Sequence, residues 1–322
     1  MKTFPTRSIS AQPSAFSRNV FFGVFALCTA VFCLSQNLGA EPAVSTASDA
    51  IEGAVKTGVD GDRVWIDLRS GSRHHFGTTL PRRAVRELPG KGLEIRRQAG
   101  TVRIDAPLGE RGRFKFVADP EYRQALTDRG LLSGTTSVEQ LFELAMIDVT
   151  LDFIDDLAAL GYREDLRRLV EMRIHEVSAT YVRELQGVGL SGLPSQRLVE
   201  MRIHGVEADD VAEWRRLGLG ELPPQRLVEM AIHGVTPDYV SSLRELGVDG
   251  LTAGRLVEMR IHGVDASFVR DMIGLGYDNV PVHRWAEMRI HGVDGDFVRK
   301  LAKRGETGLS VGQLIERRIH GG

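Results

Sequence analysis

Six histidines recur along the second half of the chain at a constant spacing of 29 residues, and each follows a glutamate by four positions. This spacing places both side chains on one face of a helix. An imidazole beside a carboxylate could bind a metal ion or titrate near neutral pH. The pairs are Glu171–His175, Glu200–His204, Glu229–His233, Glu258–His262, Glu287–His291 and Glu316–His320.

A structural role for these histidines is the interpretation we favour. A histidine in the last turn of a helix can bond the free carbonyls there and suits the negative end of the helix dipole, and the glutamate would support its charged form. A metal site would be incomplete with one histidine and one glutamate per helix, because packed helices stand roughly 8–10 Å apart. A third alternative is an array that responds to pH by protonation of its histidines.

Two rows of arginines accompany the histidines. Salt-bridged, solvated helix faces are the default interpretation of both rows. The alternative is that an arginine row binds acidic groups of a partner through planar, bidentate donors. The first row stands three positions before the paired glutamates and comprises Arg168, Arg197, Arg226, Arg255 and Arg284. The second stands two positions after them, and its members are the predicted partner-binding residues: Arg173, Arg202, Arg260, Arg289 and Arg318.

Other motifs point to no chemistry. His74 and His75 are neighbours in an expected strand, where successive side chains point to opposite faces. His175-Glu176 begins like a zinc-peptidase motif, but Ala179 stands where the second histidine is needed. The sequence has no nucleophile elbow, phosphate-binding loop or dinucleotide fingerprint. We therefore predict no catalytic residue, no cofactor, no metal and no enzymatic activity.

The histidines lie in a repeat of two short helices. The first ends in Arg-Ile-His-Gly-Val, and the second begins at a capping residue such as Thr236, Asp265 or Asp294. Apolar residues follow the cap at positions +3, +4, +7 and +10, and glycine follows at +11, where it can close a helix. Helices of about ten residues need stacked neighbours to be stable. The sequence therefore predicts an α-solenoid of about seven 29-residue hairpins over residues 119–322.

One unit departs from this pattern. Position +3 after the cap is aromatic in the other units but is Asp210 in the fourth. Trp214, one turn later, can refill the space, which would leave a locally repacked core. A bend or a binding notch is the alternative.

The residues before the array divide into three segments. Residues 1–40 are predicted to be a signal peptide, with an apolar run over 20–34 that could alternatively remain as a membrane anchor. Both cysteines, Cys28 and Cys33, lie within this segment. Residues 41–60 are predicted to be a linker. Residues 61–118 alternate with a period of two and predict a small antiparallel β module that packs against the first hairpins. The fold class is therefore α+β.

The repeat resembles that of uncharacterised bacterial exported proteins with tandem Leu-x-x-Leu-Arg-x-His-Gly-Val-Thr-Pro-x-Phe-Val-x-x-Leu segments. Similar repeats trail BlaR-like sensor peptidases. The stretches at 98–102 and 112–116 are similar to the module that precedes the repeats in those exported proteins. The resemblance covers nearly the whole chain after the leader. It implies an envelope protein and carries no assigned activity.

These observations predict a non-catalytic, exported scaffold that binds a protein or peptide in the periplasm or outside the cell. The alternative is an envelope regulator or inhibitor of a peptidase or signalling protein. The leader holds three of the 41 basic residues and none of the 43 acidic ones, so the remainder is acidic. We therefore expect no nucleic-acid partner, and a membrane partner only if the leader is retained. Self-association through the last hairpin is a further expectation.

Overall fold

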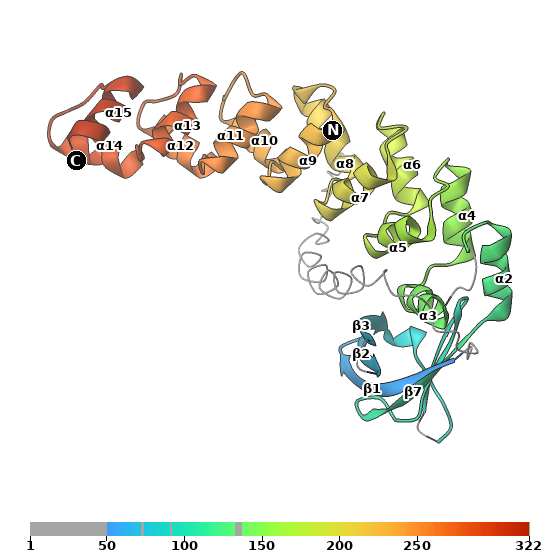
Figure 1. The fold of residues 1–322 in the computed structure, drawn as a ribbon. Helices are drawn as coiled ribbons and strands as arrows, with labels where there is room; N and C mark the ends of the chain where they lie inside the picture. The colour runs from blue at the N-terminus through green and yellow to red at the C-terminus, as the bar shows by residue number, and fades with distance from the viewer. Residues whose placement is uncertain (1–49, 72–73, 91, 133–136, 322) are drawn as a thin grey trace, which may run out of the picture. The chain divides into compact units, whose positions relative to one another are not determined.

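The computed structural model describes residues 50–321, apart from 72–73, 91 and 133–136. The chain forms two compact units, divided between Leu151 and Asp152. The first contains a seven-stranded antiparallel sheet and one helix pair, and the second contains the remaining helices (Figure 1). The predicted α+β fold, with a β module followed by paired helices, is confirmed. The predicted signal peptide and membrane anchor lie outside the described residues.

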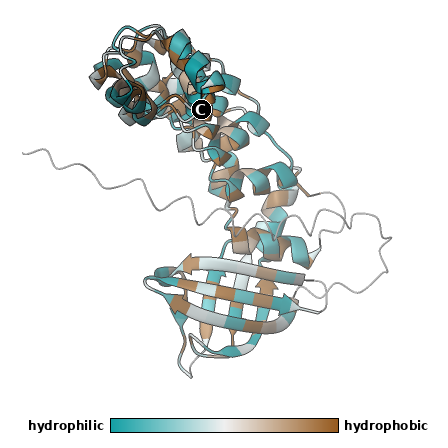
Figure 2. Ribbon diagram, turned by 90° about the vertical axis from the view of Figure 1, so that its left-hand side faces the viewer, coloured by the Kyte–Doolittle hydropathy of each residue, from teal (hydrophilic) through white to brown (hydrophobic). Residues whose placement is uncertain are grey.

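Strands that are neighbours in the sheet are consecutive in the sequence, except that β1 pairs with β7. Its order is β3-β2-β1-β7-β6-β5-β4, and every pair is antiparallel. The strands alternate between apolar and polar residues along their length (Figure 2). Their bounds are β1 Ala50–Asp60, β2 Arg63–Ser70, β3 His74–Pro81, β4 Arg86–Glu87, β5 Leu93–Arg97, β6 Gly100–Ile104 and β7 Arg111–Ala118, with a short 3₁₀ turn, η1, at Arg82–Ala84.

The linker predicted over residues 41–60 is wrong in its second half, because residues 50–60 form strand β1. This strand is central, pairing with β2 on one side and β7 on the other. Its alternation is hidden in the sequence by small residues. A side chain at Gly53, which lies on the buried face with Ile51 and Val55, would collide with the Arg69 carbonyl and the Phe114 ring, so the strand has no apolar side chain at this position of the alternation.

The first helix pair belongs to the unit of the sheet. Helices α2 (Pro120–Asp128) and α3 (Val138–Ile147) repeat the pattern of the array, but α3 packs on strands β1, β6 and β7. The Phe142 ring lies 5.7 Å from that of Phe114 and 5.2 Å from that of Phe116. The β module therefore packs against the first hairpin, as the size of the sheet led us to expect.

The second unit consists of six helix pairs that follow one another (Figure 1). Helices of the same kind pack directly on each other, α7 on α9 and α10 on α12 for example. A first helix, which carries the aromatic position, and a second helix, which carries the histidine, make one pair. The pairs are α4 Leu151–Ala159 with α5 Leu166–Ile174, α6 Ala179–Gly187 with α7 Ser195–Ile203, α8 Ala208–Trp214 with α9 Pro224–Ile232, α10 Pro237–Glu245 with α11 Ala253–Ile261, α12 Ala266–Gly274 with α13 Val282–Ile290, and α14 Gly295–Lys303 with α15 Val311–His320.

Capping chemistry sets the ends of these helices. Side chains of Ser178, Thr236, Asp265 and Asp294 each accept a hydrogen bond from the backbone N–H three residues later. The glycines after the helices have positive φ, as predicted; Gly247, at 77°, is one of them. Leucine, valine and methionine side chains between these ends are buried and form one continuous core. In the part of the chain that the structure describes, no helix has the length and apolar character to cross a membrane.

Candidate binding surface

The arginines predicted to bind a partner lie over aromatic rings of the preceding helix. Tyr181 and Tyr239, for example, are buried. Each donates its hydroxyl hydrogen to the backbone carbonyl of a valine 25 residues later, in the loop after the second helix of its pair. A guanidinium at this distance from a ring stabilises the contact by cation–π attraction. The stacked pairs are Arg173 on Phe153, Arg202 on Tyr181, Arg260 on Tyr239, Arg289 on Phe268 and Arg318 on Phe297, with distances of 4.7–5.5 Å to the ring centroid.

Each of the last three arginines also lies against the glycine turn of the preceding pair. Arg260 donates from Nε to the carbonyl of His233 at 3.3 Å. A methyl group on Gly234 would lie 3.0 Å from Nη2 of Arg260. Gly263 and Gly292 stand in the same relation to Arg289 and Arg318. Glycine at this turn therefore supplies both the left-handed backbone and the space for the guanidinium.

The ionic partners of this arginine row differ along the array. Arg202 pairs with Glu207 at 2.6 Å and with Glu176 at 3.7 Å. Glu176 itself stands at the glycine position of its unit, with φ at 57°. The other end of the row is different, because within the described residues no carboxylate forms an ion pair with Arg260, Arg289 or Arg318.

Five of the six glutamates predicted to support the histidines bind arginines of their own helix instead. The partner stands three positions before each of these five glutamates, and both side chains are partly exposed. A spacing of three brings side chains together as well as a spacing of four does, and the long arginine reaches the carboxylate. The pairs are Arg168–Glu171, Arg197–Glu200, Arg226–Glu229, Arg255–Glu258 and Arg284–Glu287.

The histidines stand at the ends of their helices. The backbone N–H of the first five donates to the carbonyl of the glutamate four positions before, at 3.0–3.2 Å, and His320 is the last residue of α15. Burial lowers the pKa of His175, against the opposing effect of the Glu171 charge. Within the described ranges, no three histidine, aspartate or glutamate side chains lie close enough to hold a metal ion. The five at helix C-caps are His175, His204, His233, His262 and His291.

His74 and His75 lie in β3, as expected. His75 is exposed, and its Nε2 lies 2.7 Å from a carboxylate oxygen of Asp67 on β2. The pKa of Asp67 is lowered by its hydrogen bonds with Arg69 and His75, against the opposing effect of burial. This is a surface contact between neighbouring strands.

A row of exposed isoleucines is the feature that sequence reasoning missed. Four of the five end a second helix, Ile319 stands one residue before the end of α15, and each has 46–55% of its surface exposed. A helical projection of the sequence would have indicated that these isoleucines are exposed. The buried methionine two positions earlier, Met259 for instance, lies about 200° away around the helix axis, on the opposite side. We call these residues the isoleucine row: Ile203, Ile232, Ile261, Ile290 and Ile319.

The fourth unit lacks the arginine–ring stack. Asp210 stands in place of the ring and Ala231 in place of the arginine, and a methyl group on Gly205 would meet no atom within 4 Å. Burial raises the pKa of Asp210, and the charges of Glu207, Asp209 and Asp238 add to the effect. This junction is therefore looser in side-chain contacts and more acidic than its neighbours.

Helix α8 of this unit departs from the pattern at both ends. Its N-cap residue, Glu207, makes no capping hydrogen bond through its side chain. Its last residue, Trp214, is buried, but the indole N–H finds no acceptor within the described residues. The helix then widens into a π-helical turn, η2 (Arg215–Leu219). Trp214 thus occupies the buried position that leucine or methionine takes in other units, as the repacked core predicted for this unit requires.

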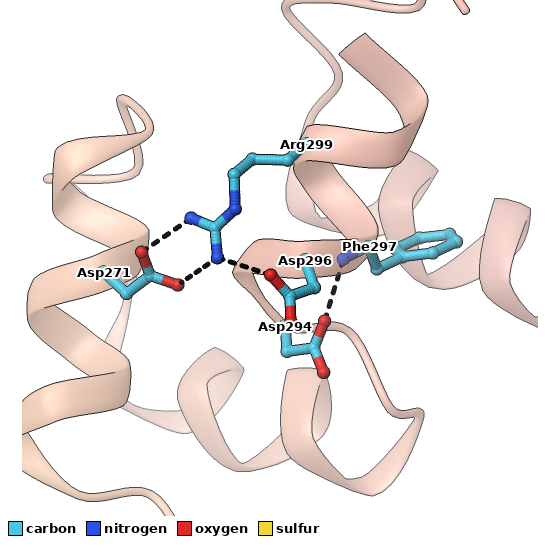
Figure 3. A network of polar contacts seen from close by, with 5 residues as sticks. All are labelled: Asp271, Asp294, Asp296, Phe297 and Arg299. Atoms are coloured by element: carbon cyan, nitrogen blue, oxygen red, sulfur yellow. Dashed lines mark hydrogen bonds and ion pairs between the residues drawn. The ribbon is translucent and has the colours of Figure 1, made fainter. Parts of the chain in front are cut away.

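A different contact joins the last two first helices. Arg299 of α14 binds both carboxylate oxygens of Asp271 on α12 and also binds Asp296 (Figure 3). The hydrogen bonds from Arg299 lower the pKa of Asp271. Asp294, beside this network, accepts from the backbone N–H of Phe297 as the cap of α14. The network ties one pair to the next.

Comparison with known proteins gives no assignment, since no family model, no curated protein and no solved structure matches the chain.

Proposed function

We propose that this chain is a non-catalytic scaffold that binds a protein partner along its helix array. One observation carries the proposal: at the same position in five successive helix pairs, an isoleucine is about half exposed. Single exposed apolar residues are ordinary on a soluble protein, but a repeated row of them is typical of a contact surface. Helical repeats commonly bind along such extended surfaces.

Both arginine rows are already engaged in the structure. The first arginine row is paired with glutamates, and the second row is stacked on rings. The isoleucines are repeated apolar residues whose side chains are exposed, so we place the binding surface on the isoleucine row rather than on the arginines alone. The leader supports an exported location, in the periplasm or outside the cell.

Capture of partners by chemical crosslinking in a native envelope extract tests this function. The bait is the full chain, beside a variant with Ile261→Ser and Ile290→Ser. A variant with Val59→Ser and Val117→Ser is the matched control, because these sheet residues are 48% and 47% exposed. We expect one abundant partner with the unmodified chain and with the control, and its loss with the isoleucine variant.

Equal recovery of that partner by all three baits would refute the isoleucine row as the binding surface. Circular dichroism of each bait checks that the serine variants keep their helix content. If the captured partner is a peptidase that loses activity on binding, the alternative function as an envelope regulator gains support.

A further inference from the structure

Cations and apolar side chains alternate along the isoleucine row. The guanidinium of Arg260 lies on the turn that follows Ile232, because it bonds the carbonyl of His233 and contacts Gly234. Arg289 lies in the same way on the turn after Ile261, at Gly263. Arg318 repeats the arrangement on the turn after Ile290, at Gly292. The surface therefore presents isoleucine, guanidinium, isoleucine, guanidinium in order from residue 232 to residue 319.

The charge balance of this region favours an acidic occupant. Arg260, Arg289 and Arg318 have no carboxylate partner in an ion pair within the described residues, whereas Arg202 has two. Arg289 lines a pocket with four aspartates, of which Asp271 and Asp296 pair with Arg299 while Asp265 and Asp294 cap helices. The pKa of Asp265 is lowered first by its hydrogen bond with Ser267 and only in smaller part by the charge of Arg289. Residues 250–322 hold 11 basic and 9 acidic side chains, whereas residues 119–249 hold 13 basic and 24 acidic ones.

The period of the row selects a backbone conformation for the occupant. Second helices pack directly on one another, so successive isoleucines stand roughly 8–10 Å apart. A polyproline II segment rises about 9.3 Å per three-residue turn, which returns every third side chain to the same side. Two residues of a β-strand rise only about 6.7 Å, and seven residues of an α-helix rise about 10.5 Å. Of the three conformations, only polyproline II has a repeat that falls within the range of 8–10 Å expected for packed helices.

We propose that residues 232–319 bind an extended acidic segment of a protein partner, with an apolar side chain at every third position and carboxylates between. The apolar side chains lie against Ile232, Ile261 and Ile290, and the carboxylates accept hydrogen bonds from the guanidinium groups that remain exposed beside them. This inference rests on the proposed function, since it names the occupant of the same surface. An extended segment has few internal hydrogen bonds to lose, so it binds without unfolding a structure of its own.

Fluorescence polarisation with a synthetic probe tests the occupant. The probe is a fluorescein-labelled peptide of six Leu-Glu-Pro repeats, titrated with the full chain. Peptides of six Leu-Lys-Pro and six Ser-Glu-Pro repeats are the matched controls for charge and for apolar contact. We expect saturable binding of the Leu-Glu-Pro peptide, at least about tenfold weaker binding of both controls, and weakening as salt is added.

Variants locate the binding. Ile261→Ser with Ile290→Ser should weaken binding of the Leu-Glu-Pro peptide about tenfold, whereas Arg270→Gln with Arg304→Gln should not, since these exposed arginines lie outside the row. Failure of the Leu-Glu-Pro peptide to bind, or equal binding of either control peptide, would overturn the inference. If the isoleucine variant nevertheless loses its partner in the crosslinking experiment, the scaffold function stands and only this occupant is refuted.

Discussion

Five junctions between helices in residues 152–321 carry an arginine stacked on an aromatic ring, and one junction, between α8 and α9, carries Asp210 and Ala231 in the same two positions. Both partners are missing together. Gly205, which would border the missing guanidinium, has open space where the equivalent Gly234 meets Arg260. Between these two junctions, the ring, the arginine and the close contact with the glycine turn are therefore present together or absent together.

The difference teaches which contacts hold the two helices of a pair together. In a repeat array each unit contacts only its neighbours, so the total stability is close to a sum over units and junctions. The buried leucines, valines and methionines are nearly the same in every unit. The fourth junction keeps this core but lacks the ring stack and the capping bond. It is therefore the junction at which the array opens most easily.

The largest expected effect comes from removing a complete ring. Tyr239 is 8% exposed, its hydroxyl bonds the carbonyl of Val264 at 2.7 Å, and Arg260 lies over its face. We expect Tyr239→Ala to lower the free energy of unfolding by about 3–5 kcal/mol, measured by guanidinium titration. Asp210→Ala, at the matching position, is the control and should cost almost nothing. Equal losses in the two variants would show that the ring stack does not distinguish the junctions.

A smaller effect isolates the tyrosine hydroxyl. Phe268 occupies the same position as Tyr239 in the next unit, without a hydroxyl. Tyr239→Phe keeps the ring and the stacked Arg260 but leaves the carbonyl of Val264 without this donor. We expect a loss of about 1 kcal/mol in the free energy of unfolding. A loss as large as that of Tyr239→Ala would mean that the hydrogen bond, rather than the ring, holds the junction.

The arginine is expected to contribute somewhat less. Arg260→Met keeps the apolar stem and removes the charge above Tyr239, so we expect a loss of about 0.5–1 kcal/mol in the free energy of unfolding.

The reciprocal change, Ala231→Arg, places a guanidinium in the open space at Gly205 beside the Asp210 carboxylate. It should raise the midpoint of thermal unfolding, while Ala302→Arg, at an exposed position on α14, should leave it unchanged. A fall in the midpoint of thermal unfolding for Ala231→Arg would show that the space at Gly205 does not accommodate an arginine side chain.

Local signals in the sequence predicted the fold well. Capping residues such as Ser178 and Asp294, and glycines eleven positions later, determine where the helices begin and end, and the structure has these ends as predicted. Each such signal acts within one or two turns of the chain. Strand β1 was missed because Gly53 takes a position on the buried face, between Ile51 and Val55, where an apolar side chain normally reveals the alternation. The Phe114 ring lies close to that position, and the sequence does not say which neighbour does so.

Contacts between helices were harder to predict than contacts within one helix. The stack of Arg260 on Tyr239 joins residues 21 positions apart, on the two helices of one pair, and only the packing of α11 on α10 brings them together. The glutamates had two geometrically acceptable partners, histidine at four positions and arginine at three, and the longer side chain took the bond. The isoleucine row could have been predicted, because Ile261 falls outside the arc of Leu256, Val257 and Met259 on a helical projection.

The smallest expected effect separates the two kinds of junction by pH. Burial and neighbouring carboxylates raise the pKa of Asp210 in the folded chain above its unfolded value near 3.9. The stability that its protonation contributes is fully present below that unfolded value and is lost as the pH rises through the folded pKa. Asp210→Asn carries no charge at any pH. We therefore expect this variant to be more stable than the original chain at pH 7, by about 0.5 kcal/mol since the carboxylate is only half buried.

The advantage of Asp210→Asn should shrink as the pH falls toward the unfolded value, because the aspartate then becomes neutral as well. His175, whose lowered pKa acts in the opposite direction, is present in both proteins and cancels in their difference. Asp249→Asn, which removes an exposed carboxylate from the loop after α10, is the matched control and should show no such pH dependence. The measurement is thermal unfolding of the original chain and of both variants at pH 7 and at pH 4. A difference that stays constant between the two would mean that Asp210 is solvated like any surface carboxylate, and that the missing stack alone makes the fourth junction weak.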